Sequence, residues 1–398
     1  MRYNSKTVVK ILAVMLLLGN TGFGIAQSLV SYETNLRSNA DFQSKEIALE
    51  VNAGRGTDIR INNNNRSIEI KTWNEPKVKV VTTIYYEGDA SKLSDEEWFE
   101  KLSLSLKGVG NTVRIKTTTV SGSGSYLVNG QSYNWSSSAN GNYGNKKDSK
   151  RIVIFVPKEN KLDIESIYGD VSVTDNLNKA VIDISNGDLE LQDLTSLTLR
   201  SKYGNVNTGN IQTGELEFSN GHLSVKNVQE LSLDTKYSTI DIETAEKLNL
   251  ISTNDEYEIE EVGSLQAQKN YGNLRIVKLT KSLDIQGINA EVKVRNIMSS
   301  VTAIKFDDKY ANLLLPLRNL KNYTINYIGP NSTVYGNFEK KAYSGTAFKT
   351  SSFEEKFGSD NGQSNDDTVS NSKFSASVGS GKGASIDMKC QNCTVDFK

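Results

Sequence analysis

Apolar and polar positions follow a short phrase that returns about every 17 residues through the middle of the chain. The phrase is a small or turn residue, a polar residue, an apolar residue, any residue and a second apolar residue. Spacing this regular is typical of stacked repeats, in which each unit buries its apolar residues against its neighbours. Nine copies occur, with drift at the first position in the later ones: 169–173, 187–191, 204–208, 221–225, 238–242, 255–259, 272–276, 290–294 and 311–315.

The residue before each phrase alternates between tyrosine and asparagine. The tyrosines are Tyr168, Tyr203, Tyr237, Tyr271 and Tyr310, and the asparagines are Asn186, Asn220, Asn254 and Asn289. We therefore expect turns of about 34 residues, each made of two unlike halves of about 17 residues. A further apolar pair precedes most phrases, so each half supplies two short strands.

These strands predict an all-β fold. Parallel strands stacked about 4.8 Å apart would line one continuous apolar interior. Because parallel crossovers are right-handed, the pattern predicts a right-handed parallel β-solenoid, or β-helix, over residues 161–317.

The flanking segments carry weaker patterns. Residues 27–46 are a polar lead-in, and residues 47–160 alternate as strands around one short helix at 94–106. That helix begins with the capping-box residues Ser94 and Glu97, and its apolar side predicts a cap over the N-terminal end of the stack. Residues 121–148 form a Gly/Ser/Asn-rich loop. Residues 318–398 are irregular strands and a C-terminal cap, interrupted by a polar linker at 358–372.

The first 26 residues have the form of a secretory signal peptide. Basic residues precede a short apolar run, and a small-residue cleavage site ends at Ala26. The run is too short to span a bilayer, so we expect no transmembrane anchor after cleavage and a periplasmic or cell-surface location.

Three segments resemble an adhesin family of exported bacterial β-strand-repeat proteins, common in Bacteroidetes and of unknown function. They are the strand pair 68–80 around Trp73, the segment 153–158 before the first repeat, and the Tyr-Gly-Asp or Asn-Gly-Asp phrases themselves. The resemblance covers about residues 50–398 and implies the solenoid fold. The family usually has a Ser-x-x-Gly turn before its last strand, where this chain has Cys390 and Cys393.

Charge and composition argue against several functions. Loss of the signal peptide removes three positive charges and takes the net charge from −1 to −4, and basic residues form no stripe, which excludes a nucleic-acid partner. The single histidine, His222, occupies a slot that Asp, Asn, Thr or Glu fills in other copies, which indicates a solvated turn. Asp170 and Asp188 could serve a glycosidase only if they projected from neighbouring half-turns. We expect no catalytic residues, no metal and no cofactor.

Two sets of aromatic residues are candidate binding sites. Tyr168, Tyr203, Tyr237 and Tyr271 would line one side of the stack, either as a ladder of packed rings or as an exposed stripe. Tyr126, Tyr133, Trp135 and Tyr143 lie among small residues in the loop at 121–148, a composition found in recognition loops. We favour the loop, with disorder as the alternative interpretation.

The two cysteines are disulfide candidates. Export places Cys390 and Cys393 in an oxidising compartment, which favours a structural disulfide over a redox-active pair.

Together these features favour a non-enzymatic exported adhesin or envelope scaffold. Its ligand would be a carbohydrate or a cell-surface protein. The alternatives are a polysaccharide-processing enzyme on a β-helix and a sensor-like envelope protein. The sequence does not specify an oligomeric state.

We predict that the protein exported by its own host begins at Gln27. Intact-mass measurement of the secreted chain, with N-terminal peptide mapping, tests this cleavage. Retention of residues 1–26 in the exported protein would contradict the signal-peptide interpretation.

Overall fold

The computed structural model describes residues 43–86, 93–117, 123–128, 131–136, 152–343 and 372–398. These residues are almost entirely β-strand, with one short helix. They fall into two compact units. The smaller comprises described residues within 1–49, 80–104 and 119–152, and the larger those within 50–79, 105–118 and 153–398.

The smaller unit holds the helix α3 (Asp95–Lys101) and the antiparallel hairpin β7 (Ser123–Val128) and β8 (Gln131–Ser136). Parts of β1 (Gln43–Asn52) and β4 (Lys77–Tyr86) complete it. The predicted capping box is present, because Ser94 Oγ accepts from Glu97 N and Glu97 Oε2 accepts from Ser94 N. Trp98 and Phe99 are buried, and the Trp98 ring lies 6.4 Å from that of Tyr86.

Two boundaries in this unit differ from the prediction. The helix ends at Lys101 and not at 106, since Ser103 has a φ of 52° and β5 (Leu104–Val109) follows. The segment 121–148 contains the β7–β8 hairpin, so it is not a loop throughout. The role of the helix as a cap of the stack stays a prediction.

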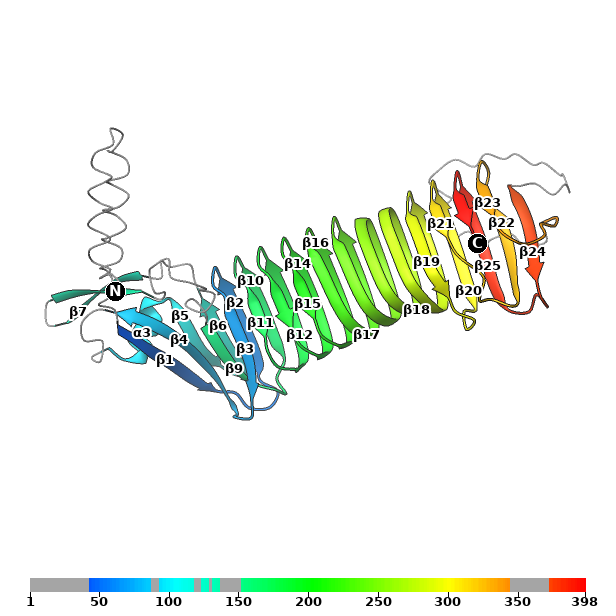
Figure 1. Cartoon of the computed structure of the whole chain (residues 1–398). Helices are drawn as coiled ribbons and strands as arrows, with labels where there is room; N and C mark the ends of the chain where they lie inside the picture. The colour runs from blue at the N-terminus through cyan, green and yellow to red at the C-terminus, as the bar shows by residue number, and fades with distance from the viewer. Residues whose placement is uncertain (1–42, 87–92, 118–122, 129–130, 137–151, 344–371) are drawn as a thin grey trace, which may run out of the picture. The chain divides into compact units, whose positions relative to one another are not determined.

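The larger unit is a stack of parallel strands, shown in Figure 1 as a series of arrows from β2 to β24. In most of the stack a coil is one long strand followed by one short strand, but residues 222–236 and 239–288 form unbroken strands that continue from one coil into the next. The coils run through β10 (Leu162–Ile167), β11 (Val171–Val173), β12 (Leu177–Ser185), β13 (Leu189–Leu191), β14 (Leu194–Lys202), β15 (Val206–Thr208), β16 (Ile211–Ser219), β17 (His222–Lys236), β18 (Thr239–Ile288), β19 (Glu291–Ile297), β20 (Ala303–Lys309) and β21 (Asn312–Leu314).

The strand register corrects the predicted period. Leu199 lies beside Leu216, and Leu216 lies beside Leu233. Each regular coil therefore stacks directly on one that lies 17 to 21 residues earlier, and a 34-residue turn of two halves is wrong. The alternation of tyrosine and asparagine distinguishes successive coils, not two halves of one coil.

The stack extends beyond the predicted repeat at its N-terminal side. β2 (Asp58–Asn64) lies between β10 and β6 (Thr112–Thr117), with Ile61 beside both Ile164 and Ile115. β3 (Ile68–Trp73) pairs with β11 on one side and β9 (Ile152–Pro157) on the other. The coil before the first regular repeat thus comes from about 100 residues earlier in the chain.

At the C-terminal side the coils are out of sequence order. β25 (Ala384–Gln391) lies between β20 and β22 (Tyr323–Ile328), and β26 (Thr394–Asp396) between β21 and β23 (Thr333–Tyr335). Figure 1 shows this as red strands between yellow and orange ones. β24 (Lys373–Val378) then pairs with β22 in the antiparallel sense. The predicted boundary at 317 does not end the stack, and most of the predicted linker 358–372 lies outside the described residues.

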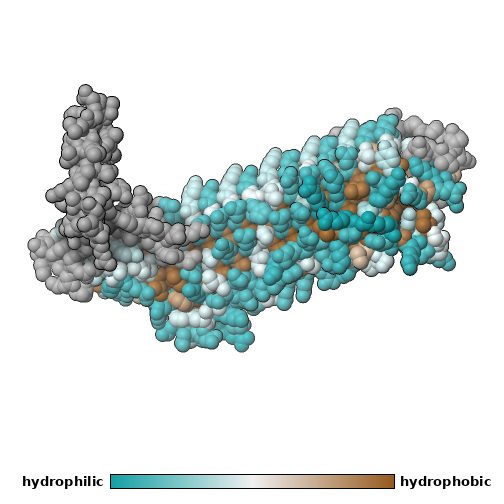
Figure 2. Space-filling view, in the orientation of Figure 1, coloured by the Kyte–Doolittle hydropathy of each residue, from teal (hydrophilic) through white to brown (hydrophobic). Residues whose placement is uncertain are grey.

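Inward-facing aliphatic side chains form the interior, and polar side chains cover much of the exterior, with apolar patches along the visible face (Figure 2). Burial of each valine, leucine or isoleucine contributes about 1.5–3 kcal/mol. Close stacking also selects glycine after the corner residue. A Cβ added to Gly204 would overlap the carbonyl oxygen of Gly187 in the preceding coil.

We predict that Leu223→Asp unfolds the stack and Ser224→Asp does not. Leu223 is fully buried beside Val206 and Ile240, whereas Ser224 points outward. An unpaired carboxylate in that interior costs several kcal/mol. Urea unfolding followed by circular dichroism compares the two variants, and greater damage from Ser224→Asp would invert the inside–outside assignment.

Candidate binding surfaces

Tyrosines and asparagines share one corner of the stack. All nine of the predicted alternating residues have φ between 54° and 63°. At seven of them the backbone N–H donates to a carbonyl oxygen of the next coil, as from Asn186 to Lys202 O and from Tyr203 to Ser219 O. Asn65 and Asn392 have the same φ and occupy the same corner in the out-of-order coils. The same φ recurs at Asn331, to whose preceding residue Asn392 donates. We call this set the corner column; along the stack it reads Asn65, Tyr168, Asn186, Tyr203, Asn220, Tyr237, Asn254, Tyr271, Asn289, Tyr310, Asn392 and Asn331.

The tyrosine side chains of the corner column are exposed, by 47% at Tyr271 up to 63% at Tyr237. Because an asparagine separates each pair, successive tyrosines lie two strand spacings apart, or about 9.5 Å. Their rings do not pack on one another, so the ladder interpretation is wrong. They form an exposed stripe with an amide between each pair of rings.

The second predicted set is described only in part. Tyr126 lies in β7, and Tyr133 and Trp135 lie in β8. Residue 126 pairs with residue 133 across the hairpin. Tyr143 lies outside the described residues, so this set stays a prediction.

The polar slot after the corner column forms an exposed ladder along the stack. Asp170 Oδ1 accepts from Asp188 N at 3.1 Å, and Asp188 Oδ1 accepts from Asn205 N at 2.9 Å. In the same slot, His222 Nε2 lies 3.4 Å from Asp241 Oδ2, and both side chains are nearly half exposed. Asp170 and Asp188 do project from neighbouring coils. Each accepts a backbone N–H of the next coil, and the next residue in the same slot is the neutral Asn205. Among the described residues, no group of His, Cys, Asp or Glu is arranged to hold a metal ion.

A second column, inside the stack and two residues before the corner, breaks the aliphatic interior. Ser166 Oγ donates to Gly169 O, and Asn63 Nδ2 donates to Arg66 O, in each case spanning the corner of its own coil. These bonds satisfy carbonyl groups that the left-handed corner removes from the strand ladder. We call this set the inner polar column; its polar members are Thr117, Asn63, Ser166, Ser201, Thr235, Ser252, Lys269 and Asp308, all buried.

Near its middle the inner polar column meets a second buried polar residue, Asp255, which follows the corner residue Asn254. Asp255 Oδ2 accepts from Thr235 Oγ1 at 2.7 Å and from Ser252 Oγ at 2.8 Å, and its Oδ1 accepts from Ser238 N. Lys269 Nζ donates to Asp255 O at 2.8 Å, Tyr271 O at 3.1 Å and Ser252 Oγ at 3.2 Å. The ammonium group thus has three acceptors. Burial still lowers the pKa of Lys269 to about 8, although the negative charge of Asp255 opposes this shift.

Asp308 lies in the same column, beside Gly287, where a side chain would overlap the backbone carbonyl oxygen of Lys269. Its Oδ1 accepts from Lys309 N at 2.6 Å, while Oδ2 has no hydrogen-bond partner among the described residues. Burial raises the pKa of Asp308 to about 7, and Asp307 adds to this effect. The carboxyl group is therefore held in an environment that favours its protonated form.

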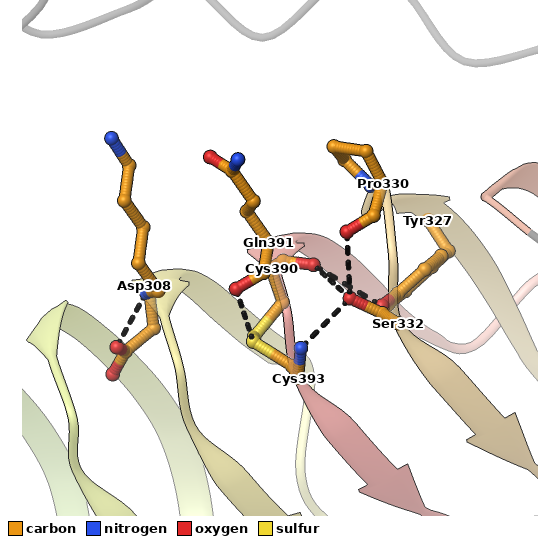
Figure 3. The surroundings of a disulfide bond; sticks show 8 residues. Asp308, Tyr327, Pro330, Ser332, Cys390, Gln391 and Cys393 are labelled. Atoms are coloured by element: carbon orange, nitrogen blue, oxygen red, sulfur yellow. Dashed lines mark hydrogen bonds between the residues drawn. A yellow bond between two sulfur atoms is a disulfide. The ribbon is translucent and has the colours of Figure 1, made fainter.

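A disulfide lies next along this column (Figure 3). It joins Cys390 and Cys393, whose Cα atoms are 5.8 Å apart, across the turn between β25 and β26. Ser332 fixes the turn, since its Oγ donates to Cys390 O at 2.7 Å and accepts from Cys393 N at 2.9 Å. The crosslink secures the C-terminal coil that is inserted between two earlier ones.

The inner polar column was not predicted from the sequence. Its signal was present, because Ser, Thr, Asn, Lys or Asp stands where the alternation calls for an inward apolar residue. Such residues read as interruptions of a strand until the strand register aligns them in one column.

Comparisons with known proteins find solved structures that resemble this one only weakly. No family model and no curated protein matches the chain. The structure is similar to that of a candidate adhesin from Bacteroides fragilis, with 17% identity and a TM-score of 0.34 over 63% of this chain and 97% of that one. It is also similar to a candidate lipid-binding protein from Parabacteroides distasonis, with 14% identity and a TM-score of 0.30 over 68% and 92%.

A third similar structure is that of a candidate cell adhesion protein from Clostridium sporogenes, with 9% identity and a TM-score of 0.17 over 89% and 99%. Scores this low assign this chain neither a fold family nor a role. Within the part of the chain that the structure describes, no helix has the length and apolar character needed to cross a membrane.

We predict that Asp308 makes the protein less stable as the pH rises. Since its pKa is raised from 3.8 to about 7, the folded state holds a proton that the unfolded state releases between about pH 4 and pH 7. Stability should fall through this window by at most about 4 kcal/mol, and Asp308→Asn should flatten the dependence. Denaturant midpoints from pH 4 to pH 8 measure this, with Asp183→Asn, an exposed aspartate in a distant coil, as the matched control. An unchanged slope in Asp308→Asn would refute the assignment.

Proposed function

We propose that this protein is an exported, non-enzymatic adhesin-like protein, built as a right-handed parallel β-solenoid, that binds its ligand through the tyrosines of the corner column. The ligand is a carbohydrate or a protein on a cell surface. The stack holds the tyrosine rings at fixed intervals on a rigid support, which suits a surface that binds an extended partner.

The observation that carries this proposal is the choice of tyrosine at a strained position. A left-handed backbone costs roughly 1–2 kcal/mol for most residues, and asparagine tolerates it better. Asparagine occupies the same corner in alternate coils with the same φ, so the fold does not require tyrosine there. Since the rings are also largely exposed, burial does not compensate the strain. A strained backbone position that adds nothing to the stability of the fold is typical of functional sites.

An adhesin-like role also agrees with the chemistry of the ladder beside the column. Oxygen atoms of Asp170 and Asp188 accept backbone N–H groups of the next coil, as an asparagine or aspartate does in a turn. A glycosidase needs one carboxylic acid to donate a proton and a second carboxylate to act as base or nucleophile. The ladder offers no environment that separates two such roles.

We predict that Tyr203→Asn combined with Tyr237→Asn abolishes ligand binding without loss of stability. The substituted residue is the one that alternate coils already use, so the thermal midpoint should stay the same or rise. Binding is measured on arrays of immobilised polysaccharides and on epithelial cell layers, and released sugars are assayed in parallel.

Two further variants separate the alternatives. Asn220→Ala alters the same corner without removing a ring and should retain binding. Deletion of residues 122–147 removes the second aromatic set. Loss of binding in the deletion, with full binding by the tyrosine double variant, would move the site to that segment. Sugar release by the unmodified protein would overturn the non-enzymatic proposal.

A further inference from the structure

A groove of about 710 Å³ runs across successive coils of the stack and uses none of the corner-column residues. Each of four coils contributes three consecutive residues to it. The middle residue faces inward and forms the floor, and the residues before and after it form the two walls. The floor consists of Leu177, Leu194, Ile211 and Val228, which lie in register and are 2–5% exposed.

The first wall is a hydrogen-bonded ladder. Asp193 N donates to Asn176 Oδ1 at 3.3 Å, Asn210 N donates to Asp193 Oδ1 at 2.8 Å, and Asn227 Nδ2 donates to Asn210 Oδ1 at 2.7 Å. These bonds fix the amide planes. Within the described residues, Asn210 Nδ2 is used in no hydrogen bond, so this donor remains available at the groove.

The second wall consists of exposed side chains that are neutral and polar: Asn178, Thr195, Gln212 and Gln229. Charges lie at the ends of the groove, with Lys158 and Glu159 at one end and Glu246 at the other, and Asp193 is the charged residue between them. Amides both donate and accept hydrogen bonds, as hydroxyl groups do. The walls therefore match an uncharged ligand that is rich in hydroxyl groups.

The repeat distance selects the kind of polymer. Equivalent groups recur at every coil, about 4.8 Å apart. An extended peptide advances about 3.3 Å per residue and presents side chains to one face every second residue, so it falls out of step with the coils. A pyranose ring in an extended β-linked chain has nearly the length of one coil. Such a ring can lie over the floor, between the walls, where its hydroxyl groups meet the side chains of both walls.

We propose that this groove binds an uncharged, extended β-linked polysaccharide, with about one sugar ring per coil. The site is separate from the tyrosines of the corner column. It gives the protein a second surface whose ligand class follows from the amide walls and the coil spacing.

Titration calorimetry with neutral hexasaccharides tests this proposal on the mature protein. The probes are cellohexaose, mannohexaose, xylohexaose and chitohexaose, and maltohexaose serves as an α-linked chain that does not extend in the same way. We expect at least one β-linked probe to bind and maltohexaose to bind at least tenfold more weakly. In methyl-labelled protein, the signals of Leu194 and Ile211 should shift on addition of the bound probe.

The variant Asn210→Ala with Gln212→Ala should weaken this binding at least tenfold. The matched control is Gln266→Ala with Gln268→Ala, which removes two exposed amides from a different part of the stack. The control and the Tyr203→Asn, Tyr237→Asn variant should bind normally, so this result is independent of the corner column. The proposal is overturned if no β-linked probe binds at millimolar concentration, if maltohexaose binds equally well, or if the groove variant binds as tightly as the control.

Discussion

The structure of the larger unit depends on one backbone constraint, the left-handed residue at the corner between the long and short strands of the described coils. At this residue the chain must turn sharply from the long strand to the short one and still donate its N–H to the coil above. The glycine that often follows lets adjacent coils approach, because a side chain there would strike the carbonyl oxygen of the coil below. Where the corner is repeated without error, the parallel ladder continues on both sides of it.

The constraint also explains why polar groups lie inside an aliphatic stack. A sharp corner leaves carbonyl oxygens without partners in the ladder, and unsatisfied buried carbonyls are costly. Ser166 and Asn63 supply the missing donors from inside, and Lys269 does so for two carbonyls at once. Asp308 Oδ2 has no hydrogen-bond partner among the described residues, and burial raises the pKa of this carboxyl group. The interior thus carries an ordered set of titratable groups that stability measurements can detect.

Both proposed binding surfaces follow from the same regular stacking. Neighbouring coils are about 4.8 Å apart, so an outward side chain that recurs in each coil forms a row with equal spacing. The corner column has a ring in every second coil, whereas the groove has polar wall residues in every coil, amides in three of its four. The two arrays differ in period and chemistry, so they suit different ligands or different parts of one ligand.

The sequence by itself determined the all-β class, the residues that face inward and the existence of a special position before each phrase. These are local properties, since the alternation at Leu223 and Val225 depends only on neighbours in the chain. Only the tertiary structure decided the 17-residue coil, because the partner of each strand is chosen across the stack and both tyrosine and asparagine fit the corner. It also decided that β25 enters between β20 and β22, and that Thr235, Ser252 and Lys269 share one interior column. Such relations depend on strand register between distant segments, which a local pattern does not encode.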